Sequence, residues 1–219
     1  MSPVEEPKTA APKRGRGKGD GEGKRSMNSL VEFVLIVAVA LGLALGLQAW
    51  VVKPFRIPSE SMVPTLSVGQ RVLVDRVTLH FSDPDRGDIL VFHPPKGADD
   101  GECGASHSSN SPCPAPTKEK SSQNFIKRVV GLPGDRLKIV GNHAYINGKP
   151  QKESFARLEP CTGVCNLRRE ITIPPDHFFM MGDNRGESDD SREWGPIPKK
   201  WIIGGAFFTY WPPKRIGTL

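Results

Sequence analysis

Three segments of this sequence combine reactive side chains with residues that restrict the backbone. The first, residues 55–66 (FRIPSESMVPTL), places two serines, Ser59 and Ser61, between two prolines. Proline fixes φ and bars helix continuation, so this composition predicts a rigid irregular turn. Such a turn can hold a nucleophilic hydroxyl beside a second hydrogen-bond donor.

The second segment, residues 124–135 (NFIKRVVGLPGD), contains Lys127 inside an apolar, strand-like run that a tight turn follows. The third, residues 180–195 (MMGDNRGESDDSREWG), is a dense set of charged and small residues. Each feature alone has an ordinary structural explanation, because serines are common in turns and a strand lysine usually points to solvent. Asp-Asn-Arg and Asp-Ser-Arg are most often turn or salt-bridge residues. The chemical meaning of the three segments therefore depends on their combination.

The elements that must position these segments are strands. From residue 56 onward, short β-branched or aromatic runs alternate with Gly, Pro and Asp, and no 3.6-residue periodicity is sustained. This pattern is typical of strands joined by turns, and it predicts a mainly β domain over residues 54–219. Eight runs are predicted strands: residues 71–76, 88–92, 125–130, 136–140, 144–146, 171–173, 177–181 and 202–210.

Two polar stretches interrupt the strand pattern, residues 96–122 and 150–169, and we expect both to be surface loops. All four cysteines lie in them: Cys103, Cys113, Cys161 and Cys165. Four cysteines allow three pairings, and in an oxidising compartment we favour the local pairs Cys103–Cys113 and Cys161–Cys165. A zinc site is the alternative, which the C-x9-C spacing and the scattered histidines disfavour.

Residues 33–52 (FVLIVAVALGLALGLQAWVV) carry no charged side chain. At about 1.5 Å per residue this run crosses the roughly 30 Å hydrocarbon core of a bilayer. A buried helix of a soluble protein is usually shorter and has a polar stripe. A cleaved signal peptide has a shorter apolar core and a small-x-small cleavage site, which residues 52–55 do not provide. We therefore expect one retained transmembrane helix over residues 28–53, and residues 202–210 are too short for a second.

Residues 1–27 are rich in Gly, Lys, Pro and Ala, and we expect a disordered cytoplasmic tail. This tail contains seven Lys and Arg residues against four acidic residues. The positive-inside rule then places the N-terminus in the cytoplasm and the domain after Lys53 on the extracytoplasmic side of the cell membrane. The net charge of +6 suits attraction to the anionic lipids of a bilayer. No aromatic-interleaved basic patch in the sequence indicates a nucleic-acid partner.

The reactive segments follow the predicted span in a fixed order: P-S-x-S-M-x-P-T-L, then R-G-D-I-x-V-F at residues 86–92, then K-R-V-x-G-x-P-G-D, then G-D-N-R-x-x-S-x-D-S-R. In this combination the chain resembles type I signal peptidase, the bacterial leader peptidase, a serine protease with a Ser/Lys dyad. The resemblance leaves out the tail, the 96–122 loop and much of 150–169. It implies a signal peptidase-like β fold and a membrane-bound endopeptidase that removes N-terminal signal peptides from secreted preproteins.

The resemblance also implies a role for each matched residue. The second serine of S-x-S-M, Ser61, would be the nucleophile, and the first, Ser59, would give its hydroxyl to the oxyanion hole. Lys127, which opens K-R-V-x-G-x-P-G-D, would be the general base, and Ser188 would orient it. The charged residues that family members use to support the site are matched by Asp183, Asp190 and Arg192.

A lysine suits the role of general base only if its pKa falls from about 10.4, because the ammonium form accepts no proton. The apolar neighbours of Lys127 would favour the neutral amine by desolvation. The amine could then take the Ser61 proton as the hydroxyl attacks the scissile carbonyl, without a cofactor or metal. The positions that line shallow apolar pockets in relatives, and would accept small side chains one and three residues before the cut, are matched by Ile57, Pro58, Met62, Leu66, Phe125 and Ile126.

Two other classes of protein share part of this pattern. The self-cleaving repressors of the DNA-damage response use a Ser/Lys pair on a similar β fold, but they carry a DNA-binding domain and no membrane anchor. An inactive membrane-anchored binding module would keep the fold without the chemistry, which the retention of Ser59, Ser61, Lys127 and Ser188 disfavours. The sequence leaves open the oligomeric state and the preproteins that are cut.

Overall fold

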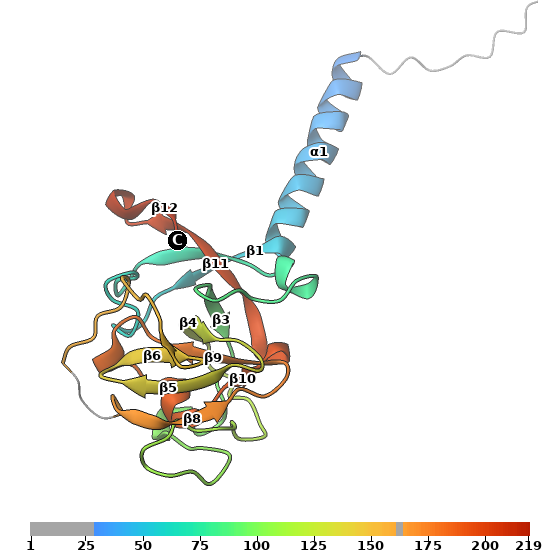
Figure 1. Ribbon diagram of the computed structural model, residues 1–219. Coiled ribbons are helices and arrows are strands. Elements are labelled where there is room, and N and C mark those ends of the chain that lie inside the picture. Colours follow the sequence, from blue (N-terminus) through green and yellow to red (C-terminus); the bar gives the residue numbers. More distant parts are fainter. Residues whose placement is uncertain (1–28, 161–163) are drawn as a thin grey trace, which may run out of the picture. The chain divides into compact units, whose positions relative to one another are not determined.

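The computed structural model describes residues 29–160 and 164–219 (Figure 1). The chain divides into two compact units, residues 1–43 and residues 44–219. The first unit holds most of the long helix α1, and the second holds the end of that helix and all of the strands. The predicted tail over residues 1–27 lies outside the described residues.

The long apolar run forms helix α1, Ser29–Val51. Its most apolar stretch, Ser29–Gly46, is long and apolar enough to cross a membrane, and none of it is buried inside the protein. The helix is shorter than the predicted 28–53 because Val52 and Lys53 begin strand β1. Pro54 accounts for this end, since proline has no N–H for a helical hydrogen bond and disfavours helical geometry at the residue before it.

Residues 44–219 are mainly β, as the sequence predicts. The larger sheet has the order β1-β2-β11-β3-β4-β9-β10, with β12 paired to β11, and each pair is antiparallel. Its strands are β1 (Val52–Arg56), β2 (Arg71–Asp75), β3 (Ile89–Phe92), β4 (Phe125–Gly131), β9 (His177–Met181), β10 (Ile197–Pro198), β11 (Ile202–Trp211) and β12 (Gly217–Thr218).

A smaller sheet is formed by the segment between β4 and β9. Its order is β7-β6-β5-β8, and Figure 1 shows β5, β6 and β8 side by side. The strands are β5 (Arg136–Val140), β6 (His143–Ile146), β7 (Lys149–Pro150) and β8 (Leu167–Thr172). Leu137 and Ile139 of β5 pack with Phe179 and Met181 of β9, so an apolar core joins the two sheets. Burying each such side chain contributes about 1.5–3 kcal/mol.

All eight predicted strands are present, and the described residues contain four more that were not predicted. Strand β1 was missed because it contains Pro54, which a sheet tolerates here since β1 is at its edge. Strands β7, β10 and β12 have two residues each, too few to show an alternation. Strand β8 begins at Leu167 and therefore takes up the end of the predicted 150–169 loop.

The 96–122 stretch is a loop with one short helical turn, η2 (Ala98–Asp100). The predicted disulfide Cys103–Cys113 is present. Cys161 lies outside the described residues, so its pairing with Cys165 stays a prediction. The backbone N–H of Cys113 donates to the carbonyl of Arg192 over 3.1 Å, which ties this loop to the third reactive segment.

Candidate active site

Ser59 and Ser61 lie in the loop that connects β1 to β2. The N–H of Ile57 donates to the carbonyl of Gln70 over 2.9 Å, which extends the β1–β2 pairing and closes the base of the loop. The two serine Oγ atoms lie 3.2 Å apart. Ser59 is exposed, whereas Ser61 is buried. The loop therefore brings the two hydroxyls together at the end of a strand hairpin.

Lys127 lies on β4, an interior strand of the larger sheet, opposite Leu90 of β3. Only 4% of its surface is exposed. Its Nζ donates to the Oγ of Ser188 over 2.9 Å and lies 5.8 Å from the centre of the Phe125 ring. The predicted pairing of Lys127 with Ser188 is thus present in the structure.

Burial lowers the pKa of Lys127 to about 8, because an ammonium ion is poorly stabilised away from water. The carboxylates of Asp190, Asp189 and Asp183 act against this shift, and the guanidinium of Arg192 acts with it. Burial outweighs the three carboxylates. A substantial fraction of the amine is therefore neutral near physiological pH, as a general base must be.

The loop after β9 carries Ser188 and contacts the segment that carries Ser61. The closest approach is at Gly182, which lies between the Ser188 hydroxyl and the Ser61 carbonyl. A Cβ atom on Gly182 would lie 2.2 Å from the Oγ of Ser188 and 2.4 Å from the carbonyl oxygen of Ser61, so the approach requires glycine. Two residues on, Asn184 donates from its N–H to the Ser61 carbonyl over 3.0 Å and from its side chain to the Glu60 carbonyl over 3.2 Å. The loop thus holds the backbone of the nucleophile candidate directly.

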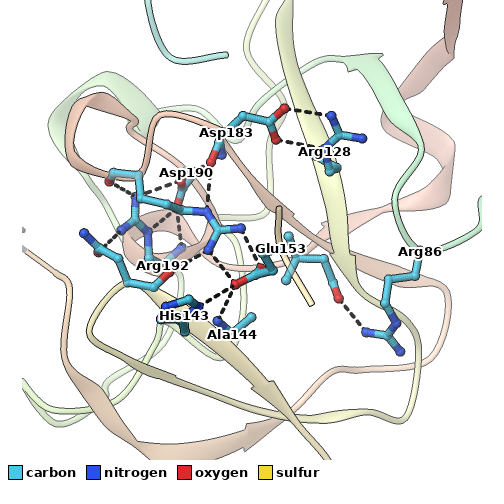
Figure 2. A network of polar contacts seen from close by, with 12 residues as sticks. Arg86, Arg128, His143, Ala144, Glu153, Asp183, Asp190 and Arg192 are labelled. Atoms are coloured by element: carbon cyan, nitrogen blue, oxygen red, sulfur yellow. Dashed lines mark hydrogen bonds and ion pairs between the residues drawn. The ribbon is translucent and has the colours of Figure 1, made fainter. Parts of the chain in front are cut away.

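Buried ion pairs hold this loop in turn (Figure 2). Asp190 receives the guanidinium of Arg192 over 2.8 and 2.9 Å, and Asp183 receives that of Arg128 over 2.8 and 2.7 Å. Burial alone would raise the pKa of Asp190, but Arg192 holds it below its usual range. Arg192 also donates to the carbonyl of Ser188 over 3.1 Å. The predicted support residues therefore act by fixing the loop that carries Ser188.

Ser61 and Lys127 line one cavity of about 290 Å³. Pro58, Phe125 and Ile126 line it as well, and Ile57 lines a neighbouring cavity that shares those three residues. The remaining predicted pocket residues, Met62 and Leu66, lie elsewhere: both are fully buried in the core and line neither cavity. Met62 and Leu66 anchor the 57–70 loop by packing into the hydrophobic core.

Several residues at the site were not predicted. The cavity wall also contains the polar side chains of Asp99, Gln123, Asn124, Glu187 and Asp189. Four further residues stand inside the matched motifs, and their place there could have indicated a role at the site: Arg128, Gly182, Asn184 and Arg185. Glu153, the partner of Arg185, stands in the predicted 150–169 loop and has no such signal. No group of three or more His, Cys, Asp or Glu side chains suited to a metal ion occurs in residues 29–160 and 164–219.

The comparison with known proteins agrees with this geometry. A family model described as signal peptidase, peptidase S26, matches residues 30–211, which include all of the site residues. The chain therefore belongs to the signal peptidase family and is a peptidase by class. It is similar to the signal peptidase I of Leptolyngbya laminosa, with 37% identity over 87% of this chain and 84% of that protein.

Two other relatives show the same agreement over most of their length. The probable signal peptidase I-1 of Synechocystis sp. is 38% identical over 86% of this chain and 86% of its own length. The signal peptidase I of Pseudomonas aeruginosa is 32% identical over 87% of this chain and 76% of its own length. The particular member that the chain resembles is thus signal peptidase I.

Proposed function

We propose that this signal peptidase removes N-terminal signal peptides from secreted preproteins with Ser61 as the nucleophile and Lys127 as the general base. One observation carries the proposal: a lysine buried to 4% exposure, with its pKa lowered to about 8, lines the same cavity as a serine held in a rigid loop. An amine in that state can accept a serine proton at physiological pH.

The reaction then follows in two halves. Neutral Lys127 takes the proton of the Ser61 hydroxyl while the oxygen attacks the scissile carbonyl, and the protonated lysine returns that proton to the leaving amine. Neutral Lys127 next takes a proton from water as that water attacks the acyl ester, and the protonated lysine returns the proton to the departing Ser61 oxygen, which restores both groups. The Ser59 hydroxyl and the Ser61 backbone N–H stabilise the oxyanion, each on the order of 3 kcal/mol. Ser188 orients Lys127 throughout.

Substrate choice is proposed to rest on the apolar walls beside Ser61. Pro58, Phe125 and Ile126 line the cavity, and Ile57 lines its neighbour, so small apolar side chains one and three residues before the cut would suit them. Met62 and Leu66 would shape these pockets from the core.

We also propose a membrane setting for the enzyme. Helix α1 is apolar over the thickness of a bilayer and ends at Val51, shortly before the 57–70 loop. The basic residues of the N-terminal segment favour a cytoplasmic N-terminus, with the catalytic domain at the extracytoplasmic face of the cell membrane. A substrate still embedded by its own apolar segment would meet Ser61 there.

Two substitutions test the catalytic pair. Ser61→Ala and Lys127→Ala should each abolish cleavage of a preprotein, whereas Lys96→Ala, which changes an exposed lysine, should leave it intact. An acylating serine inhibitor should label Ser61 in the unaltered enzyme. A chain that folds but takes no label and cuts no preprotein would be an inactive binding module, and full activity in Lys127→Ala would remove the proposed mechanism.

A further inference from the structure

Three arginines bind at the loop over residues 182–192, and each is paired with a carboxylate: Arg185 and Arg192, which are buried and belong to the loop, and Arg128 of β4, which is half-buried. Two of the carboxylates, Asp183 and Asp190, belong to the same loop. The third does not. Arg185, which is 1% exposed, pairs with Glu153, which is 8% exposed and stands in the segment between β7 and β8, outside every matched motif.

Both oxygens of the Glu153 carboxylate accept hydrogen bonds (Figure 2). One oxygen accepts from Nη2 of Arg185 over 2.6 Å, and the other accepts from Nη1 over 3.1 Å. The second oxygen also accepts from the backbone N–H of Ala144 over 3.0 Å and lies 3.6 Å from Nδ1 of His143. Glu153 is therefore fixed to the smaller sheet through β6 while it holds Arg185.

Arg185 passes this constraint to the active site. Its Nε donates to the carbonyl of Gly182 over 3.0 Å, and its Nη1 donates to the carbonyl of Asn142 over 2.6 Å. Gly182 is the residue that lies against both the Ser188 hydroxyl and the Ser61 carbonyl. The guanidinium thus connects Glu153 to the point where the two catalytic segments meet.

The backbone near Glu153 supports the same loop. The N–H of Arg157 donates to the carbonyl of Asp183 over 2.7 Å, and the N–H of Arg185 donates to the carbonyl of Arg157 over 2.9 Å. The ring of Phe155 lies 4.1 Å from the guanidinium carbon of Arg128. The residues from Glu153 to Arg157 therefore lie beside the start of the 182–192 loop and contact it at Asp183 and Arg185.

From these contacts we infer that Glu153 is a positioning residue for the reaction, acting through Arg185 on Gly182. The inference rests on the proposed roles of Ser61 and Lys127. A buried guanidinium that loses its counter-charge is strongly disfavoured. Without the carboxylate, the Arg185 side chain therefore moves toward solvent and its hydrogen bond to the Gly182 carbonyl is lost. The loop then shifts, and Ser188 no longer holds the Lys127 amine in line with Ser61.

The substitution Glu153→Gln tests this, because glutamine keeps the shape and removes the charge. We expect kcat for preprotein cleavage to fall on the order of 100-fold, as a small displacement of catalytic groups produces. KM should stay within about twofold, since Glu153 lines neither cavity beside Ser61. The matched control is Glu119→Gln, which removes an exposed ion pair with Lys96 and should leave both constants unchanged.

A double substitution separates positioning from a general loss of structure. If Glu153 acts through Arg185, then Glu153→Gln should have little further effect on kcat in an Arg185→Gln background. Multiplying losses in the double variant would overturn the inference, and so would an unchanged kcat in folded Glu153→Gln. Folding is monitored by circular dichroism and thermal unfolding of each variant.

Two further variants keep every outcome informative. If Glu153→Gln does not fold, Glu153→Asp retains the charge on a shorter side chain, and it should fold with a lower kcat and an unchanged KM. Full kcat in folded Glu153→Asp would then contradict the inference. Ser61→Ala distinguishes this failure from failure of the proposed function: residual cleavage by Ser61→Ala removes the serine mechanism, whatever Glu153 does.

Discussion

At the level of single residues, the protonation of Lys127 is a balance between burial and charge. Burial lowers its pKa to about 8 from the ordinary 10.5, although three aspartates nearby act in the opposite direction. In the proposed mechanism the active form is the neutral amine, so activity should rise as pH increases through the pKa. Burial therefore leaves a fraction of the amine neutral near physiological pH, while Asp183 and Asp190 pair with Arg128 and Arg192.

This balance can be shifted with Asp189, which is exposed and is one of the carboxylates that raise the pKa of Lys127. The substitution Asp189→Asn should lower that pKa further, because it removes a carboxylate that stabilises the charged ammonium form. The pH at half-maximal kcat/KM should move to lower values. Glu187→Gln is the control, since Glu187 lines the same cavity without being a cause of the shift; equal shifts in both variants would contradict the assignment.

Ser59 gives a second prediction at this scale. If its hydroxyl stabilises the oxyanion, Ser59→Ala should lower kcat by about 100- to 1000-fold, the usual effect of losing one such donor. KM should change little because the charge develops only in the transition state. Steady-state kinetics on a defined preprotein would measure both constants. A rise in KM at constant kcat would instead make Ser59 a substrate-binding residue.

At the level of elements, the site depends on two loops meeting at Gly182. A methyl group there would overlap the Ser188 hydroxyl and the Ser61 carbonyl, and overpacking of this kind costs about 1–3 kcal/mol. Gly182→Ala should therefore lower both the free energy of unfolding and kcat. Gly205→Ala is the control, because its Cβ would meet Leu90 at an ordinary 3.9 Å. Equal behaviour of the two variants in denaturant unfolding and kinetics would disprove the close approach.

The 96–122 loop gives a prediction about stability. The Cys103–Cys113 disulfide closes a short segment, and a loop of that size contributes about 3 kcal/mol through the entropy of the unfolded chain. Replacing both cysteines by serine should lower the free energy of unfolding by about that amount. Urea unfolding of the variant, with and without reductant, would measure it. A variant as stable as the oxidised parent would show that the loop is held by its other contacts, such as the one between Cys113 and Arg192.

The elements also show how far the sequence alone could lead. Strands such as β4 and β9 were predictable because β-branched and aromatic runs ended at turn residues. The candidate catalytic residues could be proposed because four motifs stand in a fixed order. The pairs Arg128–Asp183 and Arg185–Glu153 were not, since they join residues far apart in the chain and nothing in the local pattern links them. Met62 and Leu66 were expected in pockets because apolar side chains in a loop do not reveal which of them face the core.

At the level of the whole molecule, the apolar helix α1 and the β-rich domain are separable by composition. No residue in the apolar stretch of α1 is buried within the protein, and we expect the β-rich domain to fold without it. A chain that begins at Val52 should therefore fold in detergent-free solution and cleave a short peptide substrate. It should lose most of its rate on a preprotein embedded in vesicles, because the full-length enzyme shares the membrane with that substrate. Equal rates on the vesicle-bound preprotein would contradict the anchoring role.

The central claim is that a neutral Lys127 activates Ser61. Its most direct test is the rate of Ser61 acylation by a serine-reactive inhibitor, followed by intact mass and peptide mapping across the neutral to alkaline range. We predict labelling at Ser61 alone, with a rate that rises through a midpoint near 8 and vanishes in Lys127→Ala. A label on another residue, a midpoint at the ordinary lysine value, or undiminished labelling of Lys127→Ala would contradict the account.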